Sequence, residues 1–346
     1  MKVVAALAAA ACTLAASALA ATASSPQQVV LVTHDSFAIG KATREAFERQ
    51  TGLKLRILQT GDAGAALNRA LLTAGKPEGD AFFGVDNNLL TRALGGNLLD
   101  AYTPPALATV DHRFDLDPTH HLVPIDHSDV CLVYDRAWFA RHKLAPPRSI
   151  GQIVRYAKLL VVENPATSTP GLAFMLATIA RWGPYNGWAT IWSELRGGGV
   201  LVTSGWDEAY NARFSGSSTH KGSRPIVVSY STDPGAEVFF AGKPLSRSPV
   251  GVVEDSCFRQ VELAGVLRGA KNPAGARKLV DFMLSRRFQA GMPLTMFVLP
   301  VRRGVPQPAV FRRFNPTITR PLQLSAKTIG DNRDRWIREW TKLVLR

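Results

Sequence analysis

Hydrophobic and polar positions follow two different periods over residues 29–100. Val29-Val30-Leu31-Val32 is a continuous apolar run, which is typical of a strand buried on both faces. Residues 43–50 have the composition of a helix, and Gly52 predicts its C-terminal end. Residues 53–57 alternate apolar and basic side chains, and 81–85 form another apolar run, so both predict strands.

Two aspartates stand where helices are expected to begin. Asp62 precedes a segment in which Leu67, Leu71 and Leu72 recur on one side, and Asp86 directly follows the strand predicted at 81–85. A carboxylate in this position accepts a hydrogen bond from a free N–H of the first turn. We therefore predict that each aspartate caps the helix that follows it.

The alternation of strands and helices returns after residues 104–128, a stretch rich in Pro, His and Asp. We expect strands near 130–134, 159–162, 200–203, 226–229 and 258–267, and helices after Pro170, around 279–283 and around 336–343. This repetition predicts a mainly parallel sheet covered by helices. At 346 residues, the chain is long enough for two such α/β units. A Rossmann-type enzyme is compatible with this pattern, but no G-x-G-x-x-G follows any of the predicted strands.

The N-terminus indicates export. Lys2 is followed by an uncharged, Ala-rich run that reaches Ser25, and residues 18–20 and 21–23 both fit the small-x-small cleavage pattern. We predict a signal peptide at 1–23 and a periplasmic or otherwise extracytoplasmic mature protein. The alternative is a lipid anchor on Cys12, because Ala9-Ala10-Ala11-Cys12 loosely resembles a lipobox.

Removal of this signal would leave two cysteines, Cys131 and Cys257. An even number in an oxidising compartment is compatible with a disulfide, but also with two buried free thiols. Neither cysteine belongs to a C-x-x-C motif, so the sequence does not indicate redox or zinc chemistry.

Charge and motifs exclude several function classes. The net charge of +14 would suit a nucleic-acid surface, but the basic residues are scattered and no basic run reaches five residues. We expect no nucleic-acid partner. The sequence lacks a G-x-S-x-G elbow, a phosphate-binding P-loop and an H-E-x-x-H helix. The histidines between 112 and 127 have no recognised metal-ligand spacing, so we interpret them as part of a polar loop and expect no metal or cofactor.

Six short segments carry the most specific signal. They are Val32-Thr33-His34-Asp35-Ser36-Phe37, Gly61-Asp62, Gly84-Val85-Asp86-Asn87-Asn88-Leu89-Leu90, Asn164-Pro165-Ala166-Thr167-Ser168-Thr169-Pro170-Gly171-Leu172, Gly205-Trp206-Asp207-Glu208-Ala209-Tyr210 and Val228-Ser229-Tyr230-Ser231-Thr232-Asp233-Pro234. In this order, from about Val30 to the helix with Trp336-Ile337-x-x-Trp340, they resemble the thiamine-binding proteins of bacterial ABC importers. Those proteins are part of the type II periplasmic-binding-protein class.

The resemblance implies an α/β fold of two lobes, each a mainly parallel sheet flanked by helices, with the ligand in the cleft between them. We expect one lobe from 24–128 with 259–346 and the other from 129–258. It also implies that thiamine, or its mono- or diphosphate, is captured and delivered to an ABC permease with its ATPase. A monomeric binding protein without enzymatic activity is expected. In this fold Cys131 and Cys257 would lie on neighbouring strands that cross between the lobes, which favours a bond between them.

The resemblance also implies which residues bind the ligand. Asp62 and Ala63 match a binding Asp-Gly pair in which this chain replaces the glycine. The other matching positions are Ser168, Thr169, Trp206, Tyr230, Ser231, Thr232, Asp233, Pro234 and Phe297. His34 and His127 stand where relatives often have tyrosine.

Elementary chemistry is consistent with these assignments. Thiamine joins a flat aminopyrimidine to a permanently cationic thiazolium, so aromatic faces and carboxylates should bind it. Trp206 and Tyr230 supply rings, Asp62 and Asp233 supply charge, and the helix start at 168–170 offers groups for a hydroxyl or a phosphate.

Structural interpretations of the same residues stay open. Asp62, Ser168 or Thr169 would also serve as plain helix caps, and Trp206 as core packing. A binding protein for a metal ion, a polyamine or a phosphonate, and a secreted hydrolase, are the alternative functions.

Overall fold

The computed structural model describes residues 28–219 and 222–346, so the predicted signal peptide and Cys12 lie outside the described residues. Its strands form one mixed sheet in the order β2-β1-β3-β9-β5-β8-β6-β7, with β10 beside β5 and β4 beside β9. The strands are β1 (Gln28–Thr33), β2 (Lys54–Gln59), β3 (Ala81–Asp86), β4 (Leu99–Asp100), β5 (Val123–Asp135), β6 (Leu160–Glu163), β7 (Leu201–Thr203), β8 (Ile226–Tyr230), β9 (Val250–Leu267) and β10 (Leu299–Pro300).

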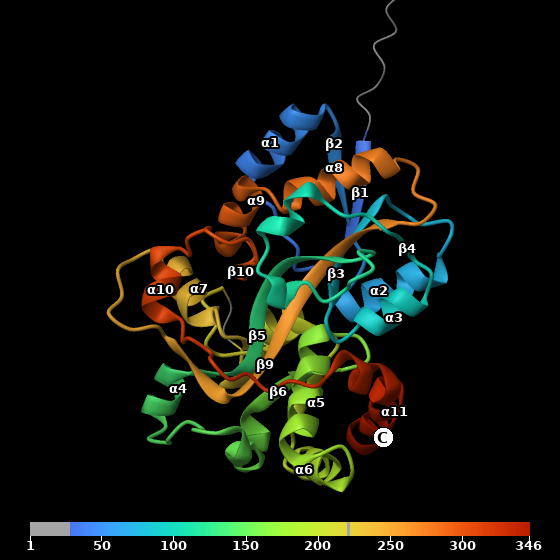
Figure 1. Cartoon of the computed structure of the whole chain (residues 1–346). Helices are drawn as coiled ribbons and strands as arrows, with labels where there is room; N and C mark the ends of the chain where they lie inside the picture. Colours follow the sequence, from blue (N-terminus) through green and yellow to red (C-terminus); the bar gives the residue numbers. More distant parts are fainter. Residues whose placement is uncertain (1–27, 220–221) are drawn as a thin grey trace, which may run out of the picture.

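Each end of this sheet is parallel, as the strand-helix repetition predicts. Strands β2, β1 and β3 are parallel to one another, and so are β8, β6 and β7. We call the part built on β2-β1-β3 the first lobe and the part built on β8-β6-β7 the second lobe. Between them run the long strands β5 and β9, which pair antiparallel with each other and with their outer neighbours (Figure 1).

Helices cover both faces of the sheet. They are α1 (Lys41–Thr51), α2 (Ala63–Leu72), α3 (Leu90–Gly95), α4 (Arg136–Arg141), α5 (Thr169–Trp182), α6 (Asn186–Gly197), α7 (Asp233–Phe240), α8 (Pro273–Met283), α9 (Arg286–Gly291), α10 (Ala309–Phe314) and α11 (Ala326–Val344). Short 3₁₀ turns lie at Pro105–Thr109, His112–Phe114, Ile150–Leu159 and Met292–Leu294, and a π-helical turn lies at Glu208–Arg213. Among the described residues, no helix is long and apolar enough to cross a membrane.

The predicted helix ends agree with the structure at two positions and differ at others. Asp62 caps α2 by accepting from the Ala63 N–H, and Gly52 ends α1 in the left-handed conformation, with φ of 70°. Asp86 instead accepts from the amides of the two residues before α3, whose N-cap is Leu89. The prediction that Leu72 lies on the buried side of α2 was wrong, because Leu72 is 88% exposed. Helix α2 packs through its alanines and Leu67, and at 3.6 residues per turn residue 72 lies about 140° around the helix axis from residue 67.

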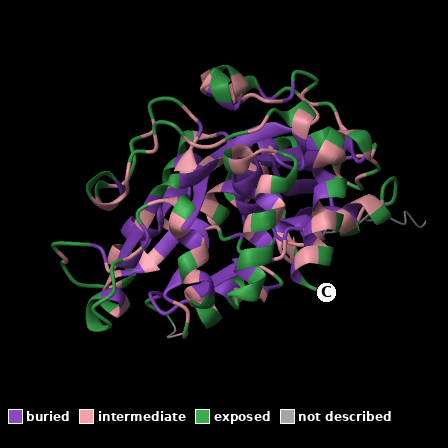
Figure 2. Ribbon diagram, turned by 90° about the horizontal axis from the view of Figure 1, so that it is seen from below, coloured by how far each residue is buried: buried purple, intermediate pink, exposed green. Residues whose placement is uncertain are grey.

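The core lies on both faces of the continuous sheet. One cluster fills the first lobe between its sheet and α1, α8 and α9, around Phe47, Phe83 and Phe282. A larger cluster extends across both lobes on the other face, beneath α2, α3, α5, α6 and α11. In Figure 2 the buried residues follow the central strands, and the exposed residues lie on the outer helices and loops. Helix α11 contacts both α6 and α3, so the C-terminal helix packs against the two lobes together.

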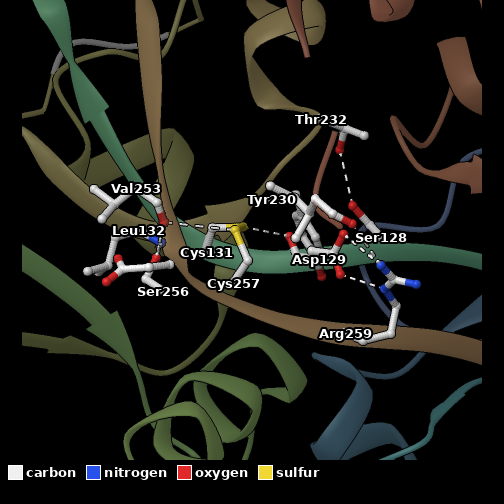
Figure 3. Close-up of a disulfide and its surroundings, with 12 residues drawn as sticks. Ser128, Asp129, Cys131, Leu132, Tyr230, Thr232, Val253, Ser256, Cys257 and Arg259 are labelled. Carbon is white, nitrogen blue, oxygen red and sulfur yellow. Dashed lines mark hydrogen bonds and ion pairs between the residues drawn. A yellow bond between two sulfur atoms is a disulfide. The ribbon is translucent and has the colours of Figure 1, made fainter. Parts of the chain in front are cut away.

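A disulfide joins Cys131 of β5 to Cys257 of β9, with an S–S distance of 2.05 Å and a Cα–Cα distance of 4.1 Å (Figure 3). The register of the two strands shifts between Val130 and Leu132, so the bond lies at a bulge in the crossing strands. Beside it, Arg259 Nε bonds to Asp129 Oδ1 at 2.5 Å. The disulfide prediction is therefore confirmed, and the alternative of two free thiols is wrong.

Candidate functional site

A cavity of about 310 Å³ lies between the two lobes. The first lobe contributes the loop after β1, the start of α2 and residues 295–298, and the second lobe contributes the starts of α5 and α7 and residues 206–211. Strand β9 contributes one acid, Glu262. The volume is at the lower end of the range usual for small-molecule sites, about 300–1,000 Å³.

Asp62 connects the two walls of the cavity. From the first residue before α2, its carboxylate accepts from Ala63 N at 2.6 Å, from Trp206 N at 3.0 Å and from Thr169 N at 3.3 Å. Burial raises the pKa of Asp62, while the surrounding N–H donors oppose that rise by stabilising the charge. Asp62 is therefore both a helix cap and a bridge from the first lobe to the second.

Glycines permit this close approach. A Cβ at Gly64 would lie 2.7 Å from the carbonyl oxygen of Thr167, and one at Gly205 would lie 3.0 Å from Asp62 Oδ2. Both contacts cross from the start of α2 to the second lobe. A larger residue at Gly64 would collide with the backbone and separate these segments.

The second lobe supplies an aromatic wall. Trp206 stacks on Tyr210 with ring centroids 5.0 Å apart and an angle of 19° between the planes, and Tyr230 lies 6.1 Å from Trp206. The indole Nε1 donates to Ser229 Oγ at 2.9 Å, which fixes the ring orientation. The wall therefore offers pre-positioned rings for a flat ligand.

The lining is acidic although the chain is basic overall. Among the described residues that line the cavity, Asp62, Asp207, Asp233, Glu237 and Glu262 are acidic, and none is Lys or Arg. Burial raises the pKa of Asp233 to about 8 and that of Glu262 to about 8. Since salt screens charges beyond about 10 Å, the basic groups elsewhere on the surface have little effect here, and a lining carboxyl that loses its proton meets no lysine or arginine among the described lining residues. The cavity therefore favours a cation over an anion.

His34 is a neutral member of the lining. Burial lowers the pKa of His34 to about 4, and its Nε2 lies 3.4 Å from Glu262 Oε1. A Cβ at Gly84 would lie only 2.7 Å from the His34 ring, so this glycine makes room for the imidazole. The ring thus occupies a tight position between β3 and the cavity.

The cavity rim has its own aromatic pair. Phe240, at the end of α7, and Phe297, in the loop after residues 292–294, have ring centroids 4.8 Å apart. Phe297 has a φ of 58°, the left-handed region that residues other than glycine seldom adopt. Because the two rings come from different lobes, this contact closes one side of the cavity.

Eight of the thirteen predicted ligand residues line the cavity. They are His34, Asp62, Ala63, Thr169, Trp206, Tyr230, Asp233 and Phe297. Five others do not line it. Ser168 is the N-cap of α5, Ser231 and Thr232 lie in the turn into α7, and Pro234 lies in the first turn of α7. His127 stacks on Phe114 with ring centroids 4.3 Å apart.

Sequence reasoning missed several lining residues. Tyr210 belongs to the Gly205–Tyr210 segment already singled out, but its ring was not assigned to the ligand. Glu262 is the one acid in the predicted strand at 258–267, and a lone acid in a buried strand is the signal that would have found it. Glu237 and Phe240 carry no comparable signal, because they lie on one ordinary helix.

Comparisons with known proteins agree with this arrangement. Residues 79–321 match the family model described as bacterial extracellular solute-binding protein. The chain is 31% identical to the thiamine-binding periplasmic protein of Brucella melitensis over 92% of both chains. It is 29% identical to the protein of that name from Escherichia coli K12, over 92% of this chain and 94% of the relative.

Solved structures show the same fold. A periplasmic thiamin binding protein superimposes with a TM-score of 0.77 at 27% identity, over 92% of this chain and 96% of the other. The periplasmic binding protein AfuA from Actinobacillus pleuropneumoniae gives a TM-score of 0.75 at 14% identity, over 93% and 99%. The two-lobed periplasmic-binding-protein fold expected from the sequence is therefore confirmed.

Proposed function

Because the chain belongs to the family of bacterial extracellular solute-binding proteins, we propose that it captures thiamine or a thiamine phosphate outside the cytoplasm and delivers it to an ABC importer. The single observation that carries the proposal is the combination of an aromatic wall with an acidic lining that contains no described Lys or Arg. A flat, permanently cationic heterocycle matches both features.

The ligand would lie against the second lobe's aromatic wall. Trp206 offers its ring to the cavity, and its backbone amide bonds to Asp62 of the first lobe, so closure and ligand contact involve the same residue. Thr169, at the start of α5, also lines the cavity, and its hydroxyl would meet the hydroxyethyl end. Lobe closure about β5 and β9 is the expected motion.

The remaining parts of the proposal concern the protein's cellular context. We infer that the protein is exported by its leader, acts without catalysis as a monomer, and meets a permease with its ATPase. We also propose that the lobes divide as 24–128 with 259–346 and 129–258. The mass of the mature N-terminus would separate cleavage after residue 23 from lipidation at Cys12.

Calorimetry on the purified mature protein tests the proposal. Thiamine, its monophosphate and its diphosphate are titrated beside ferric ion, spermidine and a simple alkylphosphonate. We expect saturable 1:1 binding of at least one thiamine compound and a matching rise in melting temperature. Binding of a metal, polyamine or phosphonate with no response to any thiamine compound would refute it. Turnover of ester or phosphate substrates would instead support the hydrolase.

A further inference from the structure

Three acids lie side by side across the strands that connect the lobes. Glu262 of β9 pairs in register with Asp86 of β3 on one side and with Asp126 of β5 on the other. All three are buried, with exposed fractions of 7%, 0% and 1% respectively. Because register partners on adjacent strands point to the same face, the row concentrates negative charge at one place.

The other acids around the cavity already have hydrogen-bond donors. Asp62 accepts from three backbone amides, and Asp233 accepts from Tyr230 N at 3.2 Å in the first turn of α7. Glu237 accepts from Tyr210 Oη and from Ser218 N, both at 2.8 Å. Such donors favour the ionised form of a carboxyl and so oppose the effect of burial.

Glu262 differs from them. Its polar neighbours among the described residues are the carboxyl of Asp126, its register partner on β5, and the neutral imidazole of His34. The other titratable groups that act on it are Asp86 from β3, Asp62 from the start of α2 and Tyr230 from the end of β8. No cation is among the groups that act on Glu262, so Glu262 cannot ionise without cost; Arg333 of α11 acts on Asp86, at one end of the row.

We propose that Glu262 is the residue that selects for positive charge in the ligand, and that it releases a proton when a cation enters the cleft. In the empty cleft, Glu262 and Asp126 hold at least one proton between them. When the cation arrives, the O–H bond on Glu262 breaks, the proton passes to solvent, and the carboxylate pairs with the ligand. One positive charge enters with the ligand and one leaves with the proton, so the net charge of the cleft does not change.

Physical conditions support this exchange at neutral pH. Burial and the charge of Asp86 raise the pKa of Glu262 to about 8, so the empty site is largely protonated at pH 7. Burial and the charge of Glu262 raise the pKa of Asp126 well above its usual range, so Asp126 keeps its proton. A neutral ligand of the same shape would leave the proton in place.

This inference rests on the proposed function, and calorimetry of the intact mature protein tests it. Thiamine is compared with its uncharged deaza analogue, in which a thiophene replaces the thiazolium. Titrations at pH 7 in two buffers of different ionisation enthalpy give the number of protons released. We expect release approaching one proton with thiamine and none with the analogue.

The variant Glu262→Gln should abolish proton release and reduce the preference for thiamine over the analogue by about tenfold or more. Glu254→Gln is the matched control, since Glu254 lies exposed on the same strand and should change neither quantity. Should Glu262→Gln fail to fold, Glu262→Asp retains an ionisable group and should still release the proton.

The results that would contradict the role of Glu262 differ from those that would contradict thiamine binding itself. Thiamine binding without proton release, or undiminished release and preference in Glu262→Gln, would overturn the role of Glu262 and leave the thiamine function standing. If the wild-type protein binds neither thiamine nor the analogue, the proposed function itself fails.

Discussion

Replacing Trp206 with alanine tests the aromatic wall. One face of the indole stacks on Tyr210 at 5.0 Å, and the ring also lines the cavity. A ligand ring stacked there contributes about 0.5–1.5 kcal/mol, and a cation over an aromatic face about 0.5–2 kcal/mol. We therefore expect Trp206→Ala to weaken thiamine binding by about 1–3 kcal/mol, or roughly 5- to 150-fold in Kd. The Asp62 bridge should survive, because its partner is the backbone amide of residue 206.

Calorimetry with thiamine measures the effect. Trp206→Phe keeps a ring but loses the bond to Ser229, so its Kd should fall between those of the wild type and Trp206→Ala. Trp138→Ala is the matched control, because this half-buried tryptophan stacks on His142 and does not line the cavity. An unchanged Kd in Trp206→Ala, with the fold intact by circular dichroism, would mean that the ligand binds elsewhere.

Three further predictions concern charge, pH and the disulfide. Asp62→Asn should weaken binding of thiamine more than of its neutral deaza analogue, and equal losses in the two calorimetric titrations would contradict an electrostatic role. The ligand-free protein should lose stability as pH rises from about 6.5 to 8, because folding raises the pKa of buried acids to about 7 for Asp86 and about 8 for Asp233 and Glu262. Below pH 6.5 this loss is opposed by the buried histidines His34 and His127, because burial lowers their pKa to about 4 and about 3. The test is therefore made between pH 6.5 and 8, where a rising melting temperature would refute the reasoning. The double variant Cys131→Ala/Cys257→Ala should lose about 2–5 kcal/mol in urea unfolding, and the same midpoint for the wild type with and without reductant would argue against the bond.

Local sequence patterns were sufficient to predict many of the strands and helix ends. The apolar run at 29–32, the alternation at 53–57 and the glycine at 52 each encode a strand or a helix end within a few residues, and all appear in the structure. Leu72 shows where the periodicity was misread, since alanines supply the buried side of α2. The antiparallel pairing of β5 with β9 joins residues more than a hundred positions apart, and no local pattern specifies that.

Most of the predicted site residues that line the cavity belong to the six segments singled out above. Trp206 and Asp62 belong to such segments and face each other across the lobes. His127 was assigned to the ligand by the same resemblance as His34, but it stacks on Phe114 and does not line the cavity. The resemblance does not fix which face of β5 this side chain occupies, because strand register decides that. The acid row on β3, β9 and β5 arises only when three distant strands pair, so its members could not be grouped from the sequence.

The bond between Cys131 and Cys257 turns residues 131–257 into a covalent ring that holds β6, β7, β8 and helices α4 to α7. During passage across a membrane, the ring can close as soon as its second cysteine emerges, while residues 258–346 are still to follow. The first lobe, in contrast, needs the end of β9 and the helices after it. The segment 131–257 can therefore be cross-linked before the N-terminal and C-terminal segments come together to form the first lobe.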